Sequence, residues 1–227
     1  MFKLTRFIGA VLLVAVVAIP AAALERAGTV ERQKGDATRT QGGESAPLAE
    51  GSAVYAGDKI ETADGARLIV RFTDSSTLQM GADAIIEVDE MVYDVHGLTD
   101  ATDKQGLKFV EGVFRYVSGA ISHNDFNSVA ITTPVATIGI RGTEFVAGRL
   151  TVGMPPGTSH YGYQIREGAI EIVAPGGSVT LWDNKHDWTK RGEFSRLDRR
   201  RAAIDARLRC FTPKKRNPHQ NINDRCP

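Results

Sequence analysis

The chain has 227 residues and a formal net charge of +1, with 28 Lys and Arg residues against 27 Asp and Glu residues. Hydrophobic residues make up 42% of the sequence, charged residues 24% and aromatic residues 7%. These fractions are those of an ordinary globular protein, and they exclude a disordered polyampholyte, a collagen-like repeat and a multi-span membrane protein. The balanced charge argues against general nucleic-acid binding, and two cysteines are too few for a four-cysteine zinc site.

Residues 1–23 have the pattern of a secretory signal peptide. Lys3 and Arg6 precede an uncharged apolar run over residues 7–19, and small residues follow up to Ala23. This order of basic, apolar and small segments is typical of exported proteins. The apolar run would span roughly 20 Å, short of the ~30 Å hydrocarbon core, so cleavage after Ala23 is favoured over retention as a membrane anchor. We therefore expect a periplasmic or secreted protein.

Charge is distributed unevenly after this leader. Residues 24–182 carry 13 basic and 21 acidic side chains, a net charge of −8, whereas residues 183–227 carry 13 basic and 6 acidic side chains, a net charge of +7. The change predicts an acidic body and a basic C-terminal segment with a boundary near residue 183. An oxidising compartment would also allow a disulfide bond between Cys210 and Cys226.

The alternation of apolar and polar residues over residues 24–182 predicts an all-β body. In residues 67–72, Leu68, Val70 and Phe72 share one face of a strand and Arg67 and Arg71 the other. Related patterns occupy residues 78–88, 107–117 and 129–146, and a further pair of strands, 161–165 and 169–173, is predicted to be joined through Gly168. Turn residues recur at intervals of about 8–12 residues, which suits a sandwich, a barrel or a β-solenoid.

The C-terminal segment changes its period. Ser195 followed three residues later by Asp198 is typical of a helix start. Apolar residues then recur at helical spacing, namely Leu197, Ile204, Leu208 and Phe211. We therefore expect a short amphipathic helix and an irregular tail. Its basic residues, with Arg199, Arg200 and Arg201 at their centre, could contact an anionic envelope surface or an acidic partner. Alternatively, the apolar stripe packs on the body and the charges face solvent.

Three segments of the body resemble a known family. Residues 54–62, Val-Tyr-Ala-Gly-Asp-Lys-Ile-Glu-Thr, resemble the G-D-x-I-x-T opening of the FecR domain. Residues 133–145 are similar to its T-P-x-A-x-x-x-x-R-G-T-x-F signature. Residues 68–80 resemble the hairpin between them, although Asp74-Ser75-Ser76 stands where the family usually has Asp-Gly-Ser. Together these matches cover about residues 50–148.

This resemblance implies an all-β, partly solenoid-like fold without catalysis. In the archetype of the family, a cytoplasmic anti-sigma segment precedes a membrane helix and a periplasmic β domain. Only a six-residue basic stub precedes the apolar run here, so we do not expect this chain to hold a sigma factor itself. What carries over is the periplasmic module, and an envelope or inner-membrane sensor protein is its expected partner.

Two charged residues of the signature are candidates for partner binding. Arg141 follows Gly139 and precedes Gly142, two residues that allow backbone angles or close strand approach which a Cβ would block. Arg141 can present a fixed fork to a carboxylate, and Glu144 is a candidate for that carboxylate. One interpretation makes Arg141 an internal clamp of a bulged strand, and the other places it against a ligand or partner protein.

Nothing in the sequence predicts an enzyme, a cofactor or a metal ion. The sequence contains no Walker loop, no G-x-S-x-G and no H-E-x-x-H, and the polar segment from Asp94 to Asp103 lacks the ligand spacing of an EF-hand. An alternative to protein binding is a structural module that binds peptidoglycan or surface polysaccharide through an aromatic patch. Its candidate residues, which core packing explains equally well, are Tyr161, Tyr163, Trp182 and Trp188.

Overall fold

The computed structural model describes residues 25–94, 103–123, 128–149, 161–175, 177–182, 186–190 and 193–196. These residues form sixteen β-strands and one 3-10 turn, η2 (Ile121–His123), and they contain no α-helix. The prediction of an all-β body is confirmed. The strands are β1 (Arg26–Lys34), β2 (Ala37–Gln41), β3 (Glu44–Pro47), β4 (Ala53–Tyr55), β5 (Lys59–Thr62), β6 (Arg67–Phe72), β7 (Thr77–Met80), β8 (Ile85–Val92), β9 (Lys104–Glu111), β10 (Val113–Val117), β11 (Val129–Thr132), β12 (Thr137–Arg149), β13 (Tyr161–Ala174), β14 (Gly177–Trp182), β15 (His186–Lys190) and β16 (Glu193–Arg196).

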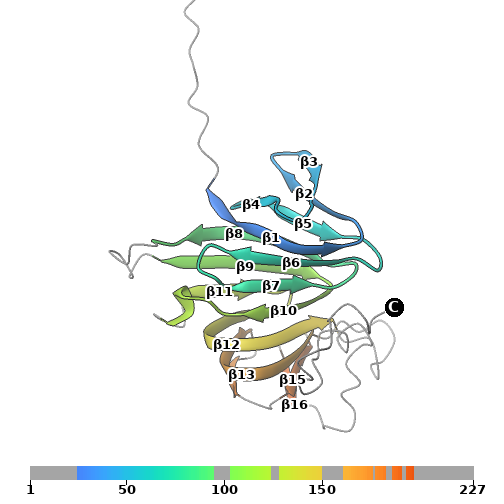
Figure 1. The fold of residues 1–227 in the computed structure, drawn as a ribbon. Helices are drawn as coiled ribbons and strands as arrows, with labels where there is room; N and C mark the ends of the chain where they lie inside the picture. The colour runs from blue at the N-terminus through green and yellow to red at the C-terminus, as the bar shows by residue number, and fades with distance from the viewer. Residues whose placement is uncertain are drawn as a thin grey trace, which may run out of the picture.

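All of these strands belong to one sheet that curls strongly into a half-barrel (Figure 1). The main path of the sheet runs β3-β2-β5-β8-β9-β11-β12-β10-β7-β6-β1-β4. The first part of β12 pairs with β11 and its last part with β10. We call the strands on the β11 side the β8 half and those on the β10 side the β6 half. The two halves face each other across the core, and β12 and β13 close one end of it.

The chain crosses between the two halves at tight corners that contact one another. β5 leads to β6, β7 to β8, and β9 to β10 across these corners. At the first corner, the Thr62 hydroxyl donates to the Gly81 carbonyl at 2.7 Å and accepts from the backbone N–H of Ala84 at 3.0 Å. At the third, Gly112 has a φ of +91°, and a Cβ there would lie 2.5 Å from Ala84. The repeated crossing between the two halves curls the sheet into the half-barrel, an all-β fold as the family resemblance implied.

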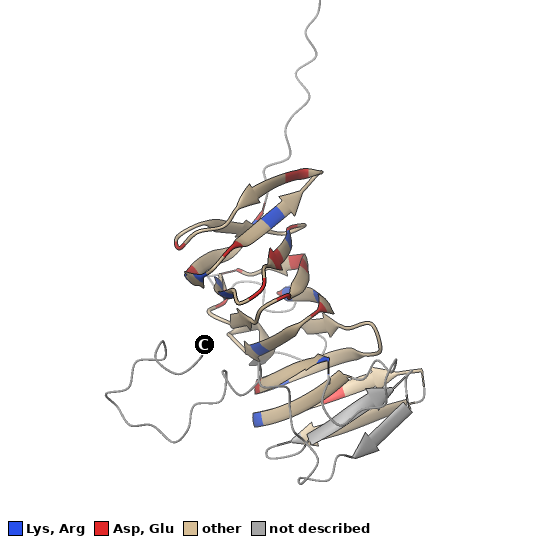
Figure 2. Cartoon of the chain, turned by 90° about the vertical axis from the view of Figure 1, so that its right-hand side faces the viewer, with Lys and Arg blue, Asp and Glu red and all other residues tan. Residues whose placement is uncertain are grey.

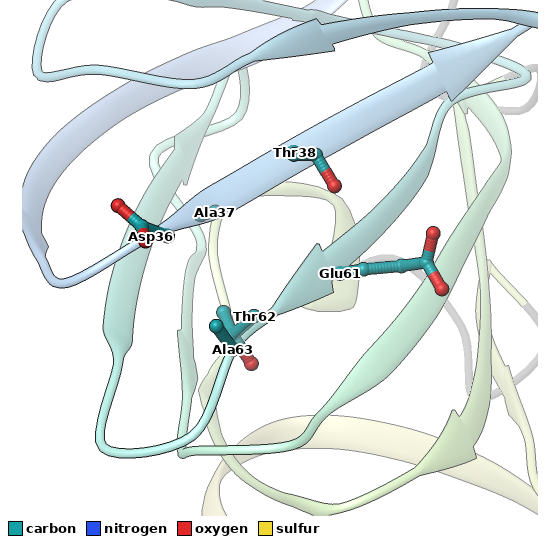
Figure 3. A pocket seen from close by; sticks show the side chains of 6 residues that line it. All are labelled: Asp36, Ala37, Thr38, Glu61, Thr62 and Ala63. Carbon is teal, nitrogen blue, oxygen red and sulfur yellow. The ribbon is translucent and has the colours of Figure 1, made fainter.

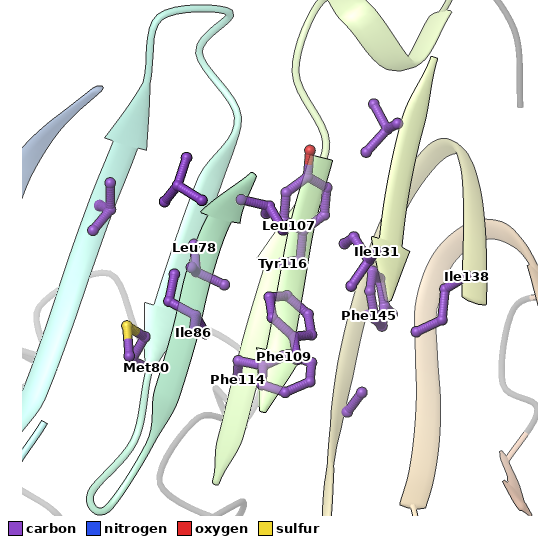
Figure 4. Packing of buried hydrophobic residues seen from close by; sticks show 14 of the residues in the cluster. Leu78, Met80, Ile86, Leu107, Phe109, Phe114, Tyr116, Ile131, Ile138 and Phe145 are labelled. Atoms are coloured by element: carbon purple, nitrogen blue, oxygen red, sulfur yellow. The ribbon is translucent and has the colours of Figure 1, made fainter. Parts of the chain in front are cut away.

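Strand alternation explains how the core is filled. On β6, Leu68, Val70 and Phe72 are buried while Arg71 is exposed, as the period-2 pattern predicted. Phe109 on β9 and Phe114 on β10 contact each other inside the core, so the two halves meet directly (Figure 4). Full burial of an apolar side chain of this size contributes about 1.5–3 kcal/mol relative to exposure.

Residues 161–174 form one long strand, which corrects the predicted pair of strands joined through Gly168. β13 pairs with β12 along its whole length, from Thr137↔Val173 to Arg149↔Tyr161. Gly168 has a φ of +75° and lies where the register of the two strands shifts. The prediction was wrong because a glycine with positive φ serves a bulge as readily as a turn.

The sheet also continues past residue 182, where the sequence placed the end of the β body. β15 pairs with the first part of β13, and β16 pairs with β15. Ser195, assigned to a helix start, lies in β16 instead. The sheet continues because the backbone groups of Tyr161–Gln164, at the free edge of β13, need hydrogen-bond partners. Strand β15 supplies these partners.

The predicted leader with its cleavage site at Ala23 lies outside the described residues. The same holds for the remainder of the predicted helix, for Arg199, Arg200 and Arg201, and for Cys210 and Cys226. Within the ranges that the structure does describe, no helix is long and apolar enough to cross a membrane.

Candidate functional site

The T-P-x-A part of the signature forms the turn between β11 and β12. The backbone N–H of Thr133 donates to the Ala136 carbonyl at 2.8 Å, and Thr133 Oγ1 accepts from the Ala136 N–H at 3.1 Å. Pro134 takes the second position of this turn, where its fixed φ is favourable. These residues therefore set the angle at which β12 enters the sheet.

The R-G-T part of the signature bends β12 at the point where the strand changes partners. Gly142 has a φ of +57°, and a Cβ on Gly168 would overlap the Gly142 carbonyl oxygen. Thr143 Oγ1 donates to the Ala169 carbonyl at 2.6 Å, and the backbone N–H of Thr143 donates to Ser118 Oγ at 2.7 Å. The bulge and these hydrogen bonds let one strand pair with both halves of the sheet.

Arg141 lies just before this bulge, opposite Ala169 on β13. Arg141 is an exposed residue. Exposure on an outward face is compatible with the contact role proposed from the sequence.

Glu144, predicted as the partner of Arg141, joins two other arginines. Arg115 Nη2 and Nε lie 2.8 and 3.0 Å from Glu144 Oε1, and Arg166 Nε lies 3.7 Å from the same oxygen. The side chains of all three residues are between 18% and 21% exposed. Burial lowers the pKa of Arg166, Glu144 opposes that change, and Arg115 adds to it. This cluster connects β10, β12 and β13 across the bend.

The G-D-x-I-x-T segment is also part of the framework. Asp58 is fully buried, and its Oδ2 accepts the backbone N–H of Tyr55 at 2.8 Å. Arg39 Nη1 lies 3.4 Å from Asp58 Oδ1, and the Arg39 guanidinium lies 5.1 Å from the centroid of the Tyr55 ring. A buried carboxylate with an arginine partner and a backbone donor thus ties Tyr55, at the end of β4, to Arg39 on β2.

A buried polar chain links the two halves at the ends of the strands far from the corners. Asp74 Oδ1 accepts from the N–H and the hydroxyl of Ser76 at 3.0 and 2.6 Å, and Gln105 Nε2 donates to Ser76 Oγ at 3.2 Å. The Tyr116 hydroxyl donates to Gln105 Oε1. All four residues are at most 1% exposed. Burial, with a smaller effect from the Asp74 carboxylate, raises the pKa of Tyr116, which therefore stays a hydrogen-bond donor.

Sequence reasoning missed this polar chain. The available signal was the alternation of strand residues, since polar side chains at inward positions must find hydrogen-bond partners.

A shallow hollow lies beside the first corner, between β2 and β5 (Figure 3). It is lined by Asp36, Ala37, Thr38, Glu61, Thr62 and Ala63. The carboxylates of Asp36 and Glu61 point away from each other at its two ends (Figure 3). The hollow thus brings no pair of titratable groups together. Within the described ranges, no group of three or more His, Cys, Asp or Glu residues is suited to a metal ion.

Two of the four aromatic residues considered for polysaccharide binding are buried in the core. Tyr161 and Tyr163 are each 2% exposed, and the Tyr161 hydroxyl donates to the Val110 carbonyl at 3.1 Å. These two rings are therefore not available to a sugar. The side chains of Trp182 and Trp188 lie outside the described part of the structure.

Basic side chains gather on the outward face of β1 and β6. We call this surface the basic face and define it by Arg32, Lys34, Arg67 and Arg71. On β6, Leu68, Val70 and Phe72 are buried and point inward. Because side chains alternate along a strand, Arg67 and Arg71 point outward. Lys34 pairs with Arg67 in register and Arg32 pairs with Ile69, which places both on the same face. On the side of the molecule seen in Figure 2, by contrast, acidic and basic positions are intermixed.

Comparison with known proteins relates the chain to one family. The FecR protein family model matches residues 58–178, more than half of the chain. No curated protein matches the sequence. Two crystal structures of a "putative anti-sigma factor" from Parabacteroides distasonis are similar, each with 15% identity and a TM-score of 0.46. The similarity covers 62% of this chain and 59% of that protein, so the chain spans less than two thirds of the length of the solved relative.

Proposed function

The chain belongs to the FecR family, and we propose that it acts without catalysis, as an exported protein-binding domain in cell-envelope signalling. The FecR family is typically non-enzymatic.

One observation carries it: the most distinctive residues of the signature hold the sheet together. Thr133 closes a turn, Gly142 and Thr143 make the bulge, and Asp58 is buried beneath Tyr55. A domain whose signature specifies its scaffold leaves its outward strand faces to carry the specificity. Exposed outward strand faces suit contact with another macromolecule better than enclosure of a small substrate.

The proposed location rests on the leader pattern of residues 1–23. Fractionation of cells that express the chain with a C-terminal tag tests it directly. We expect a tagged protein shortened by the leader in the envelope or outside the cell. Full-length protein in the cytosol would contradict export.

Affinity capture from cell envelopes tests the proposed contact. The bait is the tagged chain, and the matched control is the Phe145→Asp variant, which places a charge at a fully buried core position. We expect at least one envelope protein to be enriched by the wild-type chain and not by the unfolded control. If the folded chain enriches nothing over the control, protein binding is wrong.

A further inference from the structure

Lys34 and Arg67 lie directly opposite each other on neighbouring strands of the basic face. Their Cα positions are paired in the antiparallel β1–β6 ladder. In such a pair the Cβ atoms are about 4.5–5.5 Å apart, and like charges at that spacing are destabilising. The sheet therefore contains a like-charge pair at a position where a neutral or acidic residue would stabilise the isolated protein.

Neither Lys34 nor Arg67 forms a salt bridge within the described part of the structure. Arg32 likewise has no salt bridge among the described residues. Arg71 has one partner, Glu31, whose Oε2 lies 3.0 Å from Arg71 Nη2. The basic face thus keeps an excess of positive charge on a body whose residues 24–182 have a net charge of −8. An anionic partner is the simplest compensation for that local excess.

The chemistry around the cations narrows the class of partner. The register continues the face from Ile69 to Gln79 on β7 and from Arg71 to Thr77. Val173, the only exposed large hydrophobic side chain among the described residues, belongs to β13 and not to this face. The one apolar side chain that the register places among these cations, Ile69, is only partly exposed, so insertion into a lipid surface is disfavoured. Without an exposed ring on these strands, base stacking of a single-stranded nucleic acid is disfavoured as well.

The spacing of the cations fits a polypeptide. Alternate residues on one face of a strand, such as Arg32 and Lys34, lie about 6.8 Å apart along the strand direction. An extended peptide with an acidic residue at every second position presents its carboxylates at the same interval. Three of the four defining side chains are arginines, whose fork matches a carboxylate in two hydrogen bonds.

From this geometry we infer that the basic face binds an extended, carboxylate-rich segment of a partner protein, with Lys34 and Arg67 at its centre. This inference rests on the proposed function, because it names the chemistry of the partner surface. Binding places carboxylates over the like-charge pair and removes the repulsion that the free protein carries.

Titration calorimetry with the full chain tests the inference. The probe is a synthetic peptide of about twelve residues that alternates Glu and Thr, and the comparison peptide has the same composition with its glutamates contiguous. We expect the alternating peptide to bind about tenfold more tightly, and to lose affinity as salt is added. Equal affinity for both peptides, or binding only to phosphatidylglycerol vesicles, would overturn the proposal.

Matched variants locate the binding surface. The test variant combines Arg32→Gln, Lys34→Gln and Arg67→Gln, and the control combines Lys59→Gln, Lys104→Gln and Lys108→Gln, which removes the same charge from the β8 half. We expect the test variant to bind the alternating peptide at least about tenfold more weakly and the control to change less than about twofold. Equal losses of peptide affinity in both variants would mean that the peptide is held by general electrostatic attraction, and would overturn the proposal.

Two further measurements separate this inference from a folding defect and from the proposed function. Lys34→Gln alone removes the like-charge pair, so it should raise the Tm of the free protein by about 1–4 °C while it weakens peptide binding. A fall in both would instead indicate a structural role for Lys34 and contradict the inference. Capture from envelopes should fail with the triple variant. Capture of the same protein by the triple variant and the wild-type chain would leave the proposed function intact and refute this surface.

Discussion

Gly168 packs against the carbonyl oxygen of Gly142 so closely that a Cβ on Gly168 would overlap it. Both glycines have positive φ angles, and they face each other across the β12–β13 pair at the bend of the sheet. The bend joins the two halves of the half-barrel, so this contact decides whether β12 can pair with β11 and β10 at once.

Gly168→Ala should destabilise the protein by about 3 kcal/mol or more, because it adds steric overlap to the strain of a positive φ. Gly65→Ala is the matched control, since Gly65 has a φ of +67° and nothing within 4 Å of an added Cβ. It should cost about 1–2 kcal/mol. Urea unfolding followed by circular dichroism measures both. Similar costs for the two variants would show that the close approach at the bend is unimportant.

Thr143→Val should cost about 1–3 kcal/mol of unfolding free energy, because the Ala169 carbonyl loses its side-chain donor in a buried setting. Valine keeps the shape and β-branching of threonine, so the change isolates the hydroxyl. The same substitution at exposed Thr132 should stay within about 0.5 kcal/mol. Thermal unfolding of the two variants side by side provides the comparison, and an unchanged Tm for the Thr143 variant would argue against its role in the bulge.

Glu144→Gln should destabilise the protein by about 1–2 kcal/mol, because it leaves Arg115 and Arg166 partly buried without their shared carboxylate. Glu61→Gln is the control, since its ion pair with Lys59 is 36–41% exposed. That change should cost less than about 0.5 kcal/mol. Chemical denaturation at low and at high salt measures both, and a Glu144 effect no larger than the control effect would contradict the ion-pair cluster.

Unfolding free energy should fall as the pH rises above about 10. The pKa of Tyr116 is raised by burial in the folded protein, so above pH 10 the unfolded chain loses a proton that the folded chain retains. The stability from this group is complete below the unfolded pKa and is lost as pH rises through the folded pKa, with a slope of about 1.4 kcal/mol per pH unit. Denaturant titrations between about pH 9 and 11 should show a smaller slope for Tyr116→Phe than for wild type. Identical slopes would contradict the burial of this hydroxyl.

The outline of the body could be predicted from the sequence because its signals are local. Alternation over residues 67–72 depends only on neighbours in the chain, and it appears as predicted in β6. The role of Gly168 could not be predicted in the same way. A turn and a bulge both favour a glycine with a positive φ. Only the contact of Gly168 with Gly142, which is far away in the chain, distinguishes the bulge from a turn.

The contacts of the candidate site likewise depend on strand pairing that the sequence did not predict. The ion pair of Glu144 with Arg115 depends on which strands become neighbours. The opposition of Lys34 and Arg67 is likewise a matter of register between β1 and β6. Long-range strand pairing is what a single sequence leaves open, because period-2 patterns fix the face of a residue but not its partner across the ladder.

We propose that the folded chain works after export by contact with another protein. Photo-crosslinking in intact cells tests it most directly, with a photoreactive residue placed at Arg71 or Arg141 of the full chain. We expect a covalent adduct with a distinct envelope protein, and we expect no such adduct when the probe is carried by the core-disrupted Phe145→Asp variant. Folded, exported protein that forms no protein adduct from either position would contradict it.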